Sequence, residues 1–144
     1  NLNPNAIKNL AEHMKKNLIF LFLVISSLGF SQSPSDIAEA QLKAYNARDI
    51  DAFMAVFSDD VTLWNLGDTL PWANGATKAR EIYANLFASS PDLHSEVLSR
   101  TVIGNKVLDY ERITGRKNGE VLFLIMVYEV KNGKIFRATA IREE

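Results

Sequence analysis

Charged side chains that could do chemistry concentrate in one predicted hairpin of the chain. Residues 93–103 and 106–114 alternate as strands do, and Gly104-Asn105 between them is typical of a two-residue hairpin turn. Counting outward from this turn predicts these opposed pairs: Ile103–Lys106, Val102–Val107, Arg100–Asp109, Leu98–Glu111 and Glu96–Ile113. One face of the hairpin should then carry His94, Glu96, Leu98, Arg100, Val102, Val107, Asp109, Glu111 and Ile113.

Acid–base catalysis is the first chemistry that this face could support. Histidine titrates near neutral pH, and burial can raise the pKa of a glutamate toward the same range. We therefore predict His94 and Glu111 as catalytic candidates. The alternative for His94 is a solvated position at the rim of the sheet, because it stands at the start of its strand.

Anion binding is the second chemistry that the hairpin suggests. Arg100 and Asp109 are directly opposed in the predicted register, so their side chains should form an ion pair. That pair either stabilises the two strands or orients the guanidinium group of Arg100 toward a substrate carboxylate.

The elements that must position these residues follow from capping and periodicity. Ser33, Pro34 and Asp36 predict the start of a helix that runs to about residue 46. Apolar spacing predicts two further helices, a short one after Asp49 and one over residues 77–88. The predicted strands are 61–66, 93–103, 106–114, 120–130 and 134–142. This order predicts an α+β fold in which three N-terminal helices pack on a strongly curved antiparallel sheet, with a cavity between the two layers.

Composition limits the classes of function. The 144 residues suit a single domain, and 16 basic against 17 acidic residues argue against a nucleic-acid partner. Cysteine is absent, and His94 is the only histidine after residue 31, so we expect no metal site. Phosphate-binding glycine loops and the G-x-S-x-G and H-E-x-x-H motifs are also absent from the sequence, and we expect no cofactor.

The first residues have the pattern of an export signal. Lys15 and Lys16 precede an apolar run over residues 18–25, and small residues follow up to Ser31. We predict a signal peptide over residues 14–31, after an over-extended leader of residues 1–13, and a folded domain over residues 32–144. Export would place this domain in the periplasm or outside the cell, free of the membrane once the signal is cleaved. The alternative is an uncleaved anchor, for which the apolar run is short.

Four sequence phrases resemble one known superfamily. They are AYNARDIDAFMAVFSDDV at 44–61, REIYANLF at 80–87, GNKVLDYERITG at 104–115 and YEVKNGKIFRA at 128–138. Together with the element order, they resemble the nuclear transport factor 2-like superfamily, in its SnoaL-like and ketosteroid isomerase-like branch, over about residues 33–142. The resemblance implies a cone-shaped α+β barrel around a small-molecule pocket, and it turns the charged face of the hairpin inward. Since this fold hosts many functions, it implies no particular one.

The resemblance allows one chemistry to be tested. Steroid isomerases of this superfamily use an aspartate base and an oxyanion hole made of a tyrosine and a protonated aspartate. By our alignment those positions hold Asn65, Gln41 and Met126. An amide is no base near neutral pH and a thioether donates no hydrogen bond, so we reject steroid isomerase chemistry.

The candidate ligand-binding residues follow from the hairpin and the resemblance together. They are Gln41, Tyr45, Asn65, Trp72, Arg100, Asp109, Met126 and Tyr128. We predict first an exported domain that binds a small molecule. The alternatives are a small-molecule isomerase or hydrolase that uses Glu111 and His94, and a non-catalytic module that forms a homodimer. The homodimer would use Val97, Leu108 and Tyr110 on the outer face of the sheet.

Overall fold

The structure is a computed structural model that describes residues 32–142. Its helices are α2 (Pro34–Ala47), α3 (Ile50–Ala55) and α4 (Ala76–Ser89). Its strands are β1 (Phe57–Asn65), β2 (Ala73–Asn74), β3 (His94–Ile103), β4 (Lys106–Thr114), β5 (Leu122–Lys131) and β6 (Lys134–Arg142). The predicted leader (1–13) and signal peptide (14–31) lie outside the described residues. No helix within residues 32–142 has the length and apolar character needed to cross a membrane.

The first two helices begin at the residues that the sequence predicts. Ser33 caps α2 by accepting a hydrogen bond from the backbone N–H of Asp36, whose carboxylate in turn accepts from the backbone N–H of Ser33. Asp49 caps α3 by accepting from the backbone N–H groups of Asp51 and Ala52. Both caps satisfy N–H groups that have no partner inside the helix, so they fix where each helix starts.

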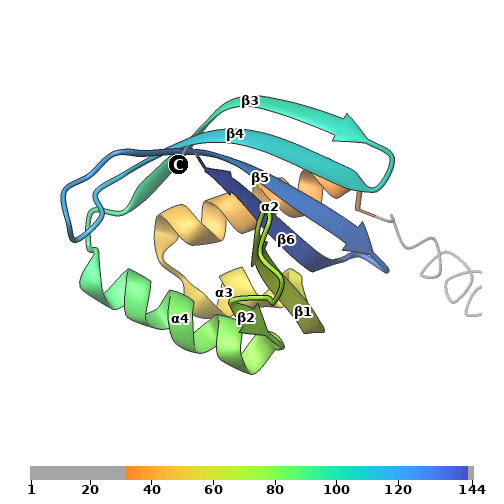
Figure 1. The fold of residues 1–144 in the computed structure, drawn as a ribbon, viewed down its shortest axis with the longest axis horizontal. Coiled ribbons are helices and arrows are strands. Elements are labelled where there is room, and N and C mark those ends of the chain that lie inside the picture. The colour runs from red at the N-terminus through yellow and green to blue at the C-terminus, as the bar shows by residue number, and fades with distance from the viewer. Residues whose placement is uncertain (1–31, 143–144) are drawn as a thin grey trace, which may run out of the picture. The chain divides into compact units, whose positions relative to one another are not determined.

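Six strands form one curved, open sheet in the order β2-β1-β6-β5-β4-β3, and the helices pack across its concave side (Figure 1). The predicted α+β layering is confirmed. Four of the five strand pairings are antiparallel, as predicted, but β1 lies parallel to β6, with Leu63 opposite Ala138. The sheet is therefore mixed. A parallel partner for β1 was not predictable locally, because α4 and four strands separate β1 from β6 in the sequence.

Two details near β1 differ from the sequence prediction. The strand begins at Phe57 rather than at the predicted residue 61, and its pairing with β6 shifts register between Phe57 and Thr62. Ala73 and Asn74, which belong to no predicted strand, also pair with β1 as β2, with Ala73 opposite Leu63. Both changes lengthen the sheet on the side where α4 packs.

An aromatic cluster joins the three helices to the sheet. Phe53 lies at its centre, fully buried, with ring centroids 4.4 Å from Tyr83, 5.0 Å from Phe57 and 5.5 Å from Phe87. Tilted and edge-on pairs of this kind each contribute about 0.5–1.5 kcal/mol beyond area burial. Tyr45 on α2 also belongs to the cluster, with its ring centroid 6.1 Å from that of Phe53, so the cluster fixes α2, α3 and α4 relative to one another.

The hairpin of β3 and β4 follows the predicted register only near its turn. Arg100 lies opposite Asp109, as predicted, and so do the pairs closer to Gly104. A bulge then occurs between Val97 and Ser99, and it inserts Leu98 as an extra residue in β3.

Beyond this bulge the predicted pairs are wrong by one residue. Val97, not Leu98, lies opposite Glu111, and Ser95, not Glu96, lies opposite Ile113. Because successive side chains alternate, the shift turns Ser95 inward and both neighbours outward. The prediction that His94 and Glu96 share the inner face is therefore wrong, and both are exposed.

Candidate functional site

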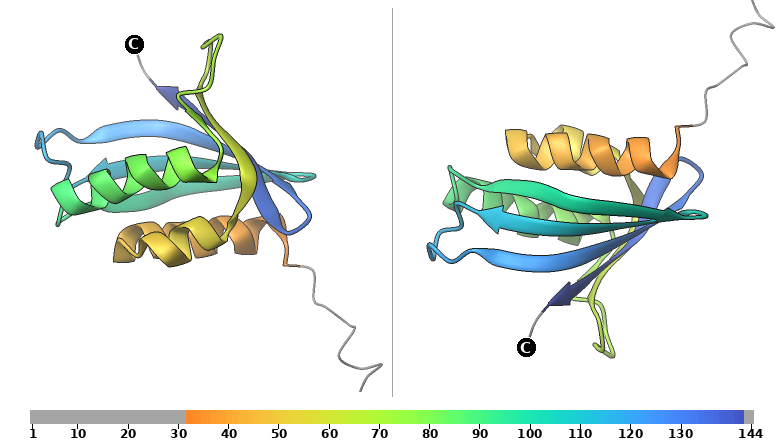
Figure 2. Two further views of the ribbon diagram at one scale, coloured as in Figure 1. Left: turned by 90° about the horizontal axis from the view of Figure 1, so that it is seen from below. Right: turned by 90° about the horizontal axis from the view of Figure 1, so that it is seen from above.

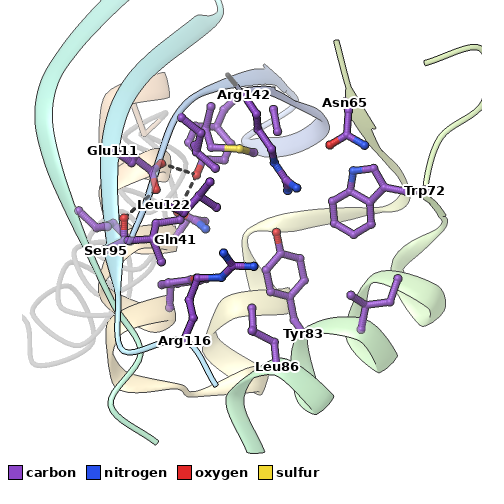
Figure 3. Close-up of a pocket in the computed structure, with 18 residues that line it drawn as sticks. Gln41, Asn65, Trp72, Tyr83, Leu86, Ser95, Glu111, Arg116, Leu122 and Arg142 are labelled. Carbon is purple, nitrogen blue, oxygen red and sulfur yellow. Dashed lines mark hydrogen bonds between the residues drawn. The ribbon is translucent and has the colours of Figure 1, made fainter. Parts of the chain in front are cut away.

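A cavity of about 350 Å³ lies between the concave face of the sheet and helices α2 and α4 (Figure 3). Most of its wall is apolar, with a few polar groups among the side chains. The apolar lining includes Leu42, Ile82, Leu86, Ile113, Leu122, Leu124, Met126 and Ala140. A concave site of this size, with few polar groups in an apolar wall, is typical of small-molecule pockets.

The carboxyl group of Glu111 is the main polar feature of the sheet side of the cavity. Glu111 projects inward from β4 and is only 5% exposed. It accepts hydrogen bonds from Ser95 Oγ at 2.7 Å and from Tyr128 Oη at 3.1 Å. Burial raises the pKa of Glu111 above its ordinary value, although these two hydrogen bonds oppose the shift.

Tyr128 links Glu111 to α2. Its hydroxyl group lies 3.2 Å from Gln41 Oε1 as well as 3.1 Å from Glu111 Oε1. A phenol has one proton to donate, so it can satisfy only one of these acceptors at a time. Tyr128 donates to Glu111 when that carboxyl is charged, and it is free to donate to Gln41 when Glu111 carries its own proton.

Ser95 is held in place by Asn46, at the end of α2. The Asn46 side chain donates to the backbone carbonyl of Ser95 at 2.9 Å and accepts from its backbone N–H at 2.7 Å. The nearby Arg48 donates to the carbonyl of Leu93 at 3.0 Å. These bonds tie the bulged end of β3 to the helix, so that the Ser95 hydroxyl group points at Glu111.

Two arginines reach the cavity from separate parts of the chain. Arg116 follows β4 and Arg142 ends β6, and Figure 3 shows both guanidinium groups turned toward the cavity on either side of the Tyr83 hydroxyl group. Gly115 fixes the start of the Arg116 loop with φ 69°, where a Cβ atom would lie 1.8 Å from the carbonyl oxygen of Asp92. Only glycine fits this position, so the loop path toward the cavity is tightly defined.

Trp72 and Asn65 line the cavity on the β1 side (Figure 3). Asn65 donates from Nδ2 to Asp68 at 2.9 Å, but its Oδ1 atom is buried without a hydrogen-bond partner. Trp72 Nε1 is likewise buried and unpartnered. This side of the wall therefore contains one acceptor and one donor that are shielded from the cavity and have no partner.

The structure brings most of the predicted site residues together. Seven of them line the cavity: Gln41, Tyr45, Asn65, Trp72, Glu111, Met126 and Tyr128. The three positions aligned with steroid isomerase groups, Gln41, Asn65 and Met126, are all in this set. Their presence in one wall agrees with the alignment by which steroid isomerase chemistry was rejected.

Three predicted site residues lie outside this cavity wall. His94 is exposed on the outer face because of the bulge, so the predicted pair of His94 and Glu111 is not assembled. Arg100 donates from two nitrogens to both oxygens of Asp109 at 2.7 Å, and to Glu39 on α2 at 3.1 Å. The geometry of Arg100 and Asp109 is that of a structural ion pair between the hairpin and α2.

Four polar residues of the wall were not predicted. Ser95 was missed because the bulge reversed its face, and Tyr83 because its spacing on α4 suggested only core packing. Arg116 and Arg142 lie at chain positions with no periodic pattern. Within residues 32–142, no group of three or more histidine, cysteine or acidic residues is arranged to hold a metal ion.

The fold and the cavity define the class: a nuclear transport factor 2-like α+β domain with a small-molecule pocket. The chain belongs to the SnoaL-like domain family, whose pattern matches residues 38–138. No curated protein matches the sequence.

Solved structures with the same fold differ in what their names report. A cystatin fold protein from Novosphingobium aromaticivorans is 28% identical, with 77% of this chain and 99% of that chain covered and a TM-score of 0.71. A putative polyketide cyclase from Sinorhizobium meliloti is 24% identical, with coverage of 73% and 93% and a TM-score of 0.63. An LEH-like epoxide hydrolase from M. tuberculosis is 18% identical, with coverage of 75% and 80% and a TM-score of 0.65.

Proposed function

We propose that this domain binds a small, largely apolar molecule in the cavity and uses Glu111 as the group that recognises its polar end. The observation that carries the proposal is the environment of Glu111. Its hydrogen-bond partners within residues 32–142 are two hydroxyl groups, and it faces an open cavity. A buried carboxyl without an ion-pair partner costs folding free energy, so such a group in a pocket wall is a candidate functional residue.

The shape of the site supports a small ligand. A volume of about 350 Å³ is near the lower end of the range for ligand pockets. Leu86 and Leu122 supply apolar contact, while Glu111 and Tyr128 supply hydrogen bonds at one place in the wall.

Binding in this cavity can be tested by filling it. We would screen a library of small amphiphilic compounds against the full chain by thermal unfolding. Leu86→Trp adds bulk inside the cavity, and Leu98→Trp adds the same bulk on the exposed bulge of β3. Compounds that bind in the cavity should raise the Tm of the wild type and of Leu98→Trp but not of Leu86→Trp. Equal shifts in all three proteins would contradict the proposal.

A second candidate function is an enzyme on the same pocket, an isomerase or hydrolase in which Glu111 moves a proton. The raised pKa of Glu111 and its link through Tyr128 to Gln41 favour this candidate. A solved structure with this fold is described as an LEH-like epoxide hydrolase, which supports hydrolysis as one form of this candidate function. Glu111→Gln separates the two candidates, because an enzyme would lose turnover while it kept ligand binding.

Export is the part of the proposal that rests on sequence alone. The pattern over residues 14–31 supports a cleaved signal, which would put the pocket in the periplasm or outside the cell. Cell fractionation of the full chain with a C-terminal tag tests this proposal. A tagged product that stays in the cytoplasm at full length would contradict it.

Homodimer formation is proposed through the outer face of the sheet. None of α2, α3 and α4 covers this face of β3, β4 and β5 (Figure 2). Tyr110 and Phe123 are 41% and 42% exposed there, with ring centroids 6.2 Å apart. Leu108 also faces outward, but Val97 lies opposite Glu111 and so was wrongly assigned to this surface. Analytical ultracentrifugation tests the homodimer: the wild type should sediment as a dimer and Phe123→Glu as a monomer. A monomeric wild type would contradict the proposal.

A further inference from the structure

We propose that Arg116, Arg142 and Tyr83 form a subsite that binds the carboxylate group of the ligand. The inference rests on the proposed function, since it names the chemical class of the molecule that enters the cavity: a small monocarboxylic acid with an apolar body.

The three side chains converge from three different elements. Arg116 comes from the loop after β4, Arg142 from the end of β6 and Tyr83 from the inner side of α4, and all three line the cavity. In Figure 3 the Tyr83 hydroxyl group lies between the two guanidinium groups. A carboxylate placed among them would meet donors from both sides.

The other arginines of residues 32–142 differ from these two because each has a carboxylate within 4 Å or donates to a backbone carbonyl. Carboxylates lie within 4 Å of four of them: Arg80, Arg100, Arg112 and Arg137. Arg48 instead donates to the backbone carbonyls of Asn46 and Leu93. Within the same residues, Arg116 and Arg142 have neither a carboxylate within 4 Å nor a hydrogen-bond acceptor. Among the described residues, nothing occupies the donors that these two arginines would offer to a ligand.

The chemistry of these donors suits a carboxylate. A guanidinium group offers parallel N–H donors in a planar arrangement that matches the two oxygens of a carboxylate. Burial and the charge of Glu111 raise the pKa of Tyr83, so its hydroxyl group stays protonated and donates at neutral pH.

Charge balance in the wall favours a single negative charge on the ligand. The ionisable groups that line the cavity are Arg116, Arg142 and Glu111, together with tyrosines that are neutral at pH 7. With Glu111 ionised, one further negative charge neutralises the wall. The apolar side chains Ile82, Leu86 and Leu122 would then cover the body of the acid, and Glu111 would accept a hydrogen bond from a donor group of the ligand beyond that body.

A matched pair of probes tests the proposal. We would titrate the full chain with 3-phenylpropanoate and with its neutral amide at pH 7 and low salt, using calorimetry. The acid should bind at least tenfold more tightly than the amide. Arg116→Gln or Arg142→Gln should each weaken the acid about tenfold, and the double variant should bind acid and amide equally. Arg112→Gln, on the outer face, is the control and should keep the preference.

A more conservative variant tests the same subsite with less risk of unfolding the domain. Tyr83→Phe removes only the hydroxyl group and should weaken the acid about threefold while the affinity for the amide stays the same. Thermal unfolding of every variant, without ligand, establishes that the change acts on binding.

The other outcomes overturn the proposal in distinguishable ways. If acid and amide bind the wild type equally and Leu86→Trp abolishes both, the cavity binds small molecules but has no anion subsite. If neither compound binds, the proposed function fails for this class of ligand together with the subsite. If 2-phenylethylphosphonate binds more tightly than the acid and depends on the same arginines, the ligand group is a phosphoryl group rather than a carboxylate.

Discussion

Asp109 and Glu111 are two residues apart on the inner face of β4, and both carboxyl groups are buried, with exposed fractions of 1% and 5%. Asp109 binds the guanidinium group of Arg100 through both oxygens, and the same guanidinium group also reaches Glu39 on α2. Glu111 has only the hydroxyl groups of Ser95 and Tyr128 as partners within the described residues, and it lines the cavity.

Burial alone therefore does not distinguish a functional carboxylate from a structural one in this domain. The charge of Asp109 is matched by a cation and its oxygens are occupied, so it stabilises the contact between the hairpin and α2. Glu111 forms no ion pair within the described residues and is held by two neutral hydroxyl groups, which leaves the group able to gain or lose a proton or to bind a ligand. The two residues should differ sharply when each is neutralised.

The largest difference should appear on replacing Asp109. We expect Asp109→Asn to lower the free energy of unfolding by about 3 kcal/mol, because it leaves the mostly buried Arg100 with only Glu39 as a charged partner. Urea denaturation measures the change. Glu96→Gln removes the exposed pair with Arg112 and should cost less than about 1 kcal/mol. Equal losses of unfolding free energy in Asp109→Asn and Glu96→Gln would mean that Asp109 stabilises the fold no more than an exposed carboxylate does.

A smaller loss is expected where the hydroxyl partner of Glu111 is removed. Ser95→Ala should destabilise the domain by about 1.5 kcal/mol at pH 7, since hydrogen bonds to charged groups contribute about that much. The pKa of Glu111 should also rise further, because the Ser95 hydrogen bond lowers it. Ser99→Ala on the outer face is the matched control and should change stability by less than about 0.5 kcal/mol. If Ser99→Ala lost as much stability as Ser95→Ala, the Ser95 hydroxyl group would contribute no more than an exposed serine does.

The smallest change in stability should come from Glu111→Gln, and it should be a gain rather than a loss. The folded state holds the Glu111 proton more tightly than the unfolded chain, because burial raises the pKa above its ordinary value of 4.5. The wild type should thus lose stability as the pH rises from 4.5 through the folded pKa, and the variant should not. We would measure the free energy of unfolding of both proteins in urea. The wild type and Glu111→Gln should be nearly equally stable at pH 4, and Glu111→Gln should be the more stable of the two at pH 8. A variant that is less stable at pH 8 would place Glu111 with Asp109 as a structural residue.

The fold was predictable because its signals are local. The caps at Ser33 and Asp49 and the turn at Gly104-Asn105 each act through residues close in sequence, and the structure confirms all three. The parallel pairing of β1 with β6 was not predictable in this way, since nothing near residue 63 indicates that its partner is residue 138.

The site was predictable only in part, and the bulge at Leu98 explains much of the difference. Counting residues from the hairpin turn assumes a regular ladder, so one extra residue exchanges the faces of His94 and Ser95. No glycine marks the bulge in the sequence. Glu111 was assigned to the correct face because β4 itself is regular. Arg116 and Arg142 were missed because a loop and a strand end carry no side-chain period.

The position of β6 has a consequence for how the chain can fold. Among the strands of residues 32–142, β6 alone joins β1 and β2 to the antiparallel strands β3, β4 and β5 in the sheet. The two parts of the sheet can therefore meet only after residue 142 has left the ribosome, through a contact that closes a long loop. A nascent chain that lacks β6 would expose one edge of β1 and one of β5, so the synthesis of β6 decides when the domain becomes a single folded unit.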